Sequence, residues 1–274
     1  MIPFINNYTC TKRQIPIILN KFNKKNINPI LYHINENKRD HIKNYNTIIE
    51  NINKYPKKHI SIKLSSLNIE NNENQCLKYL ENIMEDVKKN DCKLLIDAEN
   101  YKLQEKINLH TNYLIEKYNN KNLYIYKTYQ MYKKNECELI KDDLHKAIIN
   151  KTYLGIKLVR GAYLYKDKKF NNLCNSYHET NLNYNDALHY IIYSNILYSN
   201  NIKLMVATHN INSIFYALKL SKFSHFNGIE YAQFMGMSDN LTKIISRDKK
   251  NNVYKFIPYG DLNDSLIYLT RTLY

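Results

Sequence analysis

Short runs of β-branched and aromatic residues alternate along the chain with longer segments in which apolar residues recur every three or four positions. The short runs are typical of buried strands, and the three-and-four spacing, seen in 74–89 and 213–222, is typical of amphipathic helices. The pattern predicts eight strands, at 29–34, 59–64, 93–96, 123–127, 153–159, 202–206, 228–231 and 253–257. Because each strand is followed by a helical segment, the pattern indicates an α/β fold, a (β/α)8 barrel of the TIM type.

One domain is expected over residues 29–274, since no Gly-, Ser- or Pro-rich linker and no repeat beyond the βα unit interrupts this pattern. Residues 1–28 precede the first strand and are expected to form an N-terminal extension or leading helix that closes the bottom of the barrel. No apolar run reaches the roughly 18 to 20 residues that a transmembrane helix needs. Any contact with a membrane is therefore expected to be peripheral.

The numbers and spacings of the glycines and cysteines exclude several kinds of binding site. The chain contains only five glycines, and the first of them is Gly155. This scarcity excludes a Rossmann G-x-G-x-x-G motif and a Walker loop, both of which need glycines at fixed spacing. The five cysteines have wide spacings without a CxxC pair. They therefore predict reduced, structural thiols and no metal site.

The formal net charge is +15, a value that raises the question of nucleic-acid binding. The basic residues are spread along the chain and are mixed with Asn, and no stacking platform accompanies them. A solvated basic surface is the simpler interpretation, and no nucleic-acid partner is expected. A basic DNA- or RNA-binding protein remains the alternative, which strongly salt-dependent retention on DNA would indicate.

Polar residues follow the predicted strands at the positions where barrel enzymes assemble their active sites, the carboxyl ends. They occur in seven segments, SIKLS (61–65), DAE (97–99), TYQ (128–130), KLVRGAY (157–163), ATHN (207–210), QFMGM (233–237) and PYG (258–260). One such ending could arise by chance, whereas seven indicate a functional site at the carboxyl-terminal end of the barrel.

These segments also resemble the signatures of a known family. KLVRGAY, ATHN, AQFMGM and FIPYG followed by YLTR are similar to the motifs of the proline dehydrogenases, in the order in which that family carries them. The resemblance covers about residues 56–274 and is faint before them. It implies an FAD-dependent oxidoreductase that passes a hydride from C5 of L-proline to flavin N5 and forms Δ1-pyrroline-5-carboxylate, the first step of proline catabolism.

The resemblance also implies residue roles. Lys157 matches a basic group beside flavin N5, and Arg160 and Gly161 match positions close to the cofactor. The residues that the resemblance assigns to FAD are Gln130, Lys157, Arg160, Gly161, Ala162, Thr208, His209, Asn210 and Gln233.

For the substrate, the family pattern implies that Lys63 and Arg271 hold the carboxylate of proline, with Asp97 as the charge partner of Lys63. Tyr268 lies three positions before Arg271, so both share one helix face, and the phenol would pack on the substrate ring. Glu36 resembles an acid that forms a gate with Arg271. Taken singly, each residue has a structural alternative, such as an ion pair between adjacent strands for Lys63 and Asp97 or a core histidine for His209.

Two positions depart from the family. Thr272 stands where a second arginine is usual, which predicts weaker substrate affinity, and Phe256 stands where proline-specific members have Tyr and hydroxyproline-specific members have Ser. The bulky Phe256 favours proline over 4-hydroxyproline. A hydroxyproline dehydrogenase remains one alternative. A catalytically degenerate barrel that acts as a binding protein is another.

The resemblance further implies a quinone as electron acceptor, reached at a membrane surface, and the basic charge would favour such docking electrostatically. No acidic residue precedes Glu36, as is usual for an organellar targeting segment. We therefore expect a mitochondrial location, with a cytoplasmic location peripheral to the membrane as the alternative.

Overall fold

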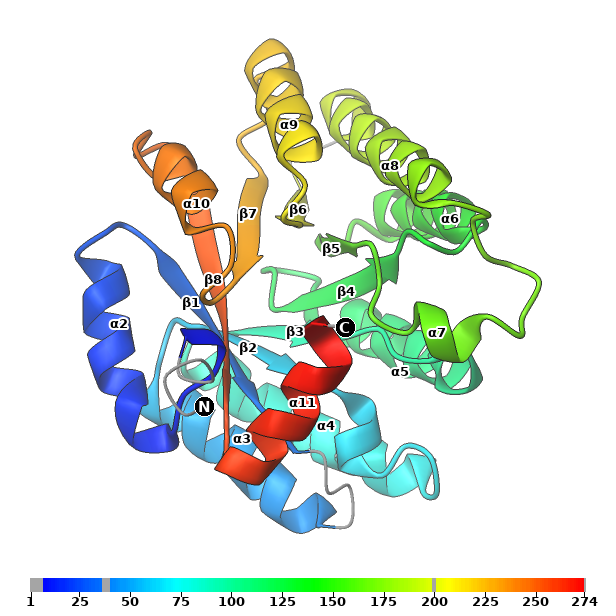
Figure 1. The fold of residues 1–274 in the computed structure, drawn as a ribbon. Coiled ribbons are helices and arrows are strands. Elements are labelled where there is room, and N and C mark those ends of the chain that lie inside the picture. The colour runs from blue at the N-terminus through cyan, green and yellow to red at the C-terminus, as the bar shows by residue number, and fades with distance from the viewer. Residues whose placement is uncertain (1–6, 36–39, 199–200, 274) are drawn as a thin grey trace. The chain divides into compact units, whose positions relative to one another are not determined.

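The eight predicted strands are present and form a closed barrel in the order β1 to β8 (Figure 1). The computed structural model describes residues 7–35, 40–198 and 201–273, without the side chains of 195–198 and 271–273. The strands are β1 (Asn28–His33), β2 (His59–Ile62), β3 (Lys93–Ile96), β4 (Ile125–Gln130), β5 (Leu154–Val159), β6 (Ile202–Ala207), β7 (Ile229–Phe234) and β8 (Asn252–Tyr259).

Helices separate the strands, as the apolar spacing predicts. The helices are η1 (Lys12–Gln14), α2 (Ile15–Asn23), α3 (His41–Lys54), η2 (Leu64–Leu67), α4 (Glu73–Lys89), α5 (Tyr101–Tyr118), α6 (Glu136–Asn150), α7 (Leu164–Asp167), α8 (Tyr177–Tyr198), α9 (Ile211–Ser224), α10 (Asp239–Ile245) and α11 (Leu262–Leu273). Asparagines cap the starts of several helices. The side chains of Asn72, Asn100 and Asn210 accept a backbone N–H from the first turn of α4, α5 and α9, respectively. Such caps satisfy donors that a helix start leaves unpaired.

The predicted (β/α)8 barrel is thus confirmed, although several strand ends differ from the prediction, most of all those of β4 and β7. β4 was predicted to end at 127 and continues to Gln130, and β7 was predicted to end at 231 and continues to Phe234. These extensions carry buried polar residues, among them Thr128, Gln130 and Gln233. Because polar residues are atypical of a buried strand, the pattern predicts strand ends before these positions.

The fold divides into two compact units, residues 1–95 with 232–274 and residues 96–231. In the first unit β1 lies between β2 and β8, so that Ile30 pairs with His59 on one side and Phe256 on the other. In the second unit β5 lies between β4 and β6, and Lys157 pairs with Thr128 and Met205. These registers determine which side chains lie side by side.

The N-terminal segment contacts the end of β8. Cys10 forms a parallel bridge with Tyr259, its N–H donates to Pro258 O, and its carbonyl accepts the N–H of Gly260. These partners lie at the carboxyl end of β8, whereas residues 1–28 are expected to close the opposite, amino-terminal end of the barrel. The expected leading helix exists as α2, after these contacts.

Among the helices that the described residues form, none combines the length and the hydropathy needed to cross a membrane.

Candidate active site

Arg160, directly after β5, is held by side chains from three elements of the second unit. Its Nε donates to Asn181 Oδ1 of α8 at 2.8 Å, Nη1 to Thr208 Oγ1 at 2.5 Å and Nη2 to Ser213 Oγ of α9 at 3.0 Å. The guanidinium also lies 4.5 Å from the ring centre of Tyr184. This is an anchored cation, in contrast to a surface arginine that reaches into solvent.

Lys157 is a second cation of the same unit. Its side chain is 7 % exposed and its Nζ donates to Asp97 Oδ1 at 2.7 Å, with the Asp97 side chain 13 % exposed. Asp97 directly follows β3 and Lys157 lies within β5, so the pair joins these two strands. The sequence selected both residues, but it did not predict this pairing.

Gly161 is a position at which the backbone has no room for a side chain. Its φ of +120° is rarely adopted by L residues, and a Cβ would lie 1.9 Å from Tyr132 Cε1. Tyr132 is itself fixed, since its hydroxyl donates to Asp167 Oδ2 at 2.7 Å. Arg160, Gly161 and Tyr132 line a cavity of about 630 Å³ that lies within this unit. Ala162, next to Gly161, is exposed.

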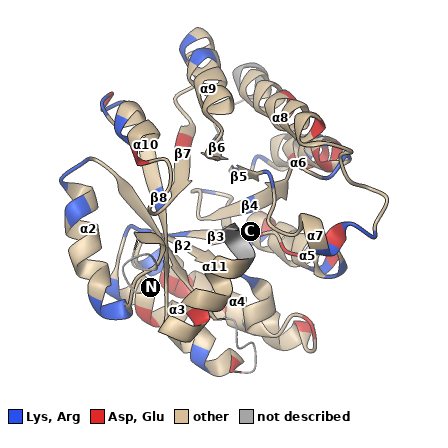
Figure 2. Cartoon of the chain, viewed as in Figure 1, with Lys and Arg blue, Asp and Glu red and all other residues tan. Residues whose placement is uncertain are grey.

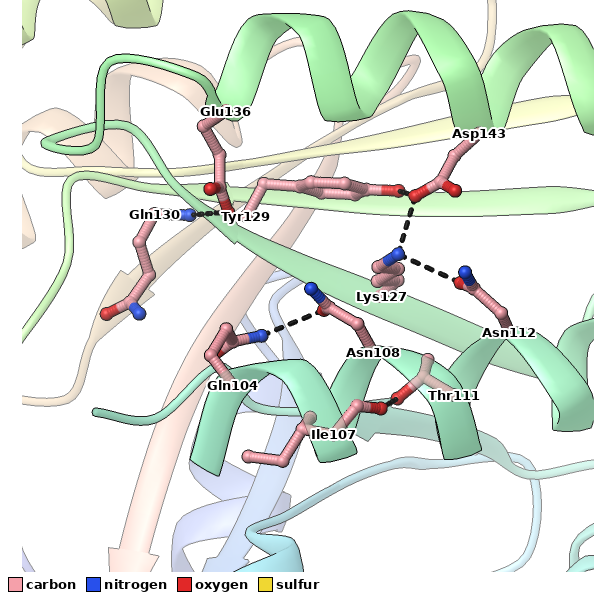
Figure 3. Close-up of polar contacts among 10 residues, drawn as sticks. All are labelled: Gln104, Ile107, Asn108, Thr111, Asn112, Lys127, Tyr129, Gln130, Glu136 and Asp143. Atoms are coloured by element: carbon pink, nitrogen blue, oxygen red, sulfur yellow. Dashed lines mark hydrogen bonds and ion pairs between the residues drawn. The ribbon is translucent and has the colours of Figure 1, made fainter. Parts of the chain in front are cut away.

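Gln130 ends β4 and is held from two sides. Its Nε2 donates to the Glu99 carbonyl at 2.8 Å, and its backbone N–H donates to Glu136 Oε1 at 2.9 Å. Figure 3 shows the Glu136 carboxylate against this backbone nitrogen, and Asp143 between Tyr129 and Lys127 on the same side of β4. Burial raises the pKa of Glu136, although Lys133 opposes the shift. Sequence reasoning missed Glu136, because its pattern is that of an ordinary helix start.

Thr208, His209 and Asn210 follow β6. Thr208 is buried and its Oγ1 accepts the hydrogen bond from Arg160, whereas His209 and Asn210 are partly exposed. The Asn210 side chain caps α9 by accepting the N–H of Ser213 at 3.0 Å. Asn210 therefore has a structural task in the described chain, besides the cofactor role that the motif implies.

Lys63, in the first unit, lies next to two aromatic rings. Its Nζ is 5.1 Å from the ring centre of Tyr32 and 5.4 Å from that of Tyr268. Tyr268 lies on α11 and is buried. Of the other predicted substrate residues, Glu36 and the side chain of Arg271 lie outside the described residues, as does the side chain of Thr272.

Gln233, near the end of β7, is 2 % exposed. Its Oε1 accepts a bond from the Thr242 hydroxyl of α10, and this orients the amide. Within the described part of the chain its Nε2 has no hydrogen-bond partner. A buried amide donor of this kind is suited to a bound group with an acceptor atom.

Lys255 shapes the loop after β7 and was not selected from the sequence. Its buried Nζ pairs with Asp239 Oδ1 at 2.7 Å and donates to the carbonyls of Phe234 and Met237 at 3.1 and 2.5 Å. Burial lowers the pKa of Lys255, and Asp239 opposes this effect. The loop contains Gly236 with φ +77°, where a Cβ would lie 2.2 Å from Asn7 O.

In the described ranges no group of three or more His, Cys, Asp or Glu side chains is arranged to hold a metal ion.

Comparison with known proteins identifies the family. The family model described as proline dehydrogenase matches residues 23–274. The chain belongs to the proline dehydrogenase family. Proline dehydrogenase 1, mitochondrial, of Dictyostelium discoideum is 31 % identical over 66 % of the chain and 34 % of that relative. A hydroxyproline dehydrogenase of Xenopus laevis is 27 % identical over 71 % of the chain and 44 % of that relative. The chain thus spans less than half the length of these two curated members of the proline dehydrogenase family.

Solved structures agree on the fold. The crystal structure of proline utilization A from Bdellovibrio bacteriovorus, inactivated by N-propargylglycine, matches 99 % of the chain and 32 % of its own length. The TM-score is 0.90 at 16 % sequence identity. At this identity the likeness shows a shared barrel, as expected for the proline dehydrogenase family.

Proposed function

We propose that the chain is an FAD-dependent proline dehydrogenase that oxidises L-proline to Δ1-pyrroline-5-carboxylate in the first step of proline catabolism. The observation that carries this proposal is the cluster around the KLVRGAY motif, in which Lys157 and Arg160 are fixed cations and Gly161 has a backbone conformation and a neighbour, Tyr132, that exclude a side chain. In the reaction, C5 of proline loses a hydride and the ring nitrogen loses a proton, so that a C5=N double bond forms.

The donor set fits a flavin dinucleotide. Arg160 and Lys157 supply positive charge suited to a pyrophosphate and to the negative charge of a reduced flavin, and Gln233 supplies a buried amide donor. The flavin, when bound, would accept the hydride at N5. We assign the cofactor contacts to Gln130, Lys157, Arg160, Gly161, Ala162, Thr208, His209, Asn210 and Gln233. Asp97 holds Lys157 Nζ in place for this role.

We assign the proline carboxylate to Lys63 together with Arg271, and the packing of the substrate ring to Tyr268. Asp97 as a charge partner of Lys63 and Glu36 as a gate with Arg271 belong to the same proposal. A carboxylate bound by two cations gains charge-assisted hydrogen bonds, which are the strong ones in proteins. Thr272 in place of a second arginine removes one such bond, so moderate substrate affinity is expected.

A hydroxyproline dehydrogenase is the second candidate, since one relative carries that name. Phe256 favours proline, because its ring packs at 5.3 Å from that of Tyr32 and at 5.4 Å from that of Phe234. A phenyl ring leaves no polar partner for the added hydroxyl, and an unpaired buried hydroxyl is costly.

For the electron acceptor we propose a quinone at a membrane surface, and for the location the mitochondrion, in line with the names of the relatives. A cytoplasmic location peripheral to the membrane is the alternative. Lys and Arg occur on helices of both units, for instance α2, α9 and α10 (Figure 2). Such dispersed positive charge favours approach to anionic lipid.

The experiment that tests the proposal is anaerobic addition of L-proline to the FAD-reconstituted protein while the visible absorbance of the flavin is followed. 4-Hydroxyproline is the comparison. We expect proline to bleach the flavin and hydroxyproline to bleach it slowly or not at all. Bleaching by hydroxyproline alone would assign the second candidate. Stable FAD binding without bleaching by either amino acid would indicate a degenerate barrel.

A further inference from the structure

Tyr32 belongs to a cluster of aromatic side chains in the first unit that also contains Phe234, Phe256 and Tyr268, here called the aromatic cluster. Tyr32 lies on β1 and is 4 % exposed. Its ring stacks on Phe256 with centres 5.3 Å apart and planes at 27°, and it lies 5.6 Å from the ring of Tyr268. Three elements, β1, β8 and α11, thus meet at this one ring.

The ring of Tyr32 also lies next to Lys63, whose Nζ is 5.1 Å from the ring centre, slightly closer than Tyr268 at 5.4 Å. A cation within about 6 Å of a ring centre is attracted by the negative face of the ring. A lysine has a flexible stem of four carbons, and contacts on two rings limit the positions of its ammonium. Tyr32 therefore contributes to where the Lys63 charge is held.

We propose that Tyr32 is a positioning and specificity-determining residue. Its ring fixes the Lys63 ammonium for a carboxylate and fixes Phe256 in the place where it excludes a ring hydroxyl. The inference rests on the proposed function, in which Lys63 binds the proline carboxylate and Phe256 discriminates against 4-hydroxyproline. No motif of the sequence selects Tyr32, because a tyrosine in a β-strand is ordinary.

The test compares Tyr32→Leu, which removes the ring, with Tyr32→Phe, which keeps it. For Tyr32→Leu we expect the KM for proline to rise about fivefold, equivalent to about 1 kcal/mol. The ratio of kcat/KM for proline to that for 4-hydroxyproline should fall by a similar factor, because Phe256 loses its stacking partner. Tyr32→Phe should stay within about twofold of the wild type in both.

Measurements of ligand binding without turnover distinguish a loss of Lys63 positioning from a general loss of structure. The FAD-loaded proteins are titrated calorimetrically with tetrahydrofuran-2-carboxylate, which has the carboxylate but no amine, and with pyrrolidine, which has the amine but no carboxylate. For Tyr32→Leu we expect the Kd of the carboxylate to rise about fivefold and that of pyrrolidine to change less than about twofold. Flavin content and melting temperature report on the fold. Tyr32→Met is the second ring-free variant if the leucine variant does not fold.

Equal weakening of both probes, or an unchanged Kd of the carboxylate in the ring-free variant, would overturn the inference and leave the proposed function standing. A wild type that binds FAD but neither probe, and that proline does not bleach, would overturn the proposed function and this inference with it. The two failures are distinguishable because the first appears only in the variants.

Discussion

His59, the first residue of β2, is a histidine that the fold keeps neutral. It is buried, and its ring lies 4.5 Å from that of Tyr254. Burial lowers the pKa of His59 from 6.5 to about 3, and Lys93 and Lys58 add to the shift. Because the folded-state pKa lies below that of the unfolded chain, the unfolded state binds more protons between these values. The stabilisation by the neutral ring is complete above pH 6.5 and is lost as the pH falls toward 3.

This predicts acid sensitivity that a substitution can reduce. Between about pH 7.5 and about pH 5.5 the free energy of unfolding should fall by about 1.4 kcal/mol through His59 alone. Urea unfolding of His59→Gln, which cannot titrate here, should show a decrease that is smaller by roughly this amount. Burial also lowers the pKa of His33, to about 4, but the titration of His33 contributes equally to the pH dependence of both proteins. Identical pH dependence in the two proteins would contradict the prediction.

At the scale of elements, Asn119 joins the end of α5 to the strands that follow. It is fully buried, and its Nδ2 donates to the carbonyls of Ile125 and Tyr153 at 3.0 and 3.1 Å. Its Oδ1 accepts the backbone N–H groups of Tyr124 and Ile125, both at 3.0 Å. One side chain thus satisfies four backbone groups at the starts of β4 and β5.

Asn119→Ala should therefore destabilise the protein by about 2–4 kcal/mol, because buried backbone groups lose their partners. Its exposed neighbour supplies a matched control: Asn120→Ala should change the free energy of unfolding by less than about 0.5 kcal/mol. Chemical unfolding of both variants measures the difference. Similar values for the two would show that solvent replaces the lost bonds.

The order and type of the elements could be predicted from local pattern, and their ends could not. β3 was predicted with its observed bounds, whereas β4 and β7 each extend three residues beyond the predicted end. The extra residues include Gln130, which Glu99 and Glu136 hold in the strand. These partners lie outside β4, so the local sequence pattern does not indicate them.

At the scale of the whole molecule, the charge of +15 is the feature that solution conditions can change most. Like charges spread over many helices repel each other in the folded state, and salt screens this repulsion over a Debye length of about 10 Å at 0.1 M. Dispersed charge also explains why the basic composition alone does not define a nucleic-acid site.

Raising sodium chloride from about 50 mM to about 500 mM should therefore raise the melting temperature, by about 2–5 °C. The control is the double variant Lys219→Glu and Lys222→Glu on the exposed face of α9, which reduces the repulsion and should respond less. Calorimetric scans of both proteins measure the effect. A melting temperature that falls with salt would show that attractive ion pairs outweigh the repulsion.

The sequence by itself determined the eight βα units, the family motifs and most of the residues proposed for catalysis. Strand and helix periodicity reflect which neighbouring positions are buried, and each motif is a contiguous stretch of residues. Both the elements and the motifs can therefore be predicted from the sequence. Only the tertiary structure decided that Asp97 pairs with Lys157, that Arg160 is anchored on Thr208, and that the Lys63 ammonium lies over the ring of Tyr32. These contacts join residues far apart in sequence, and the strand register and side-chain packing that create them exist only in the folded protein.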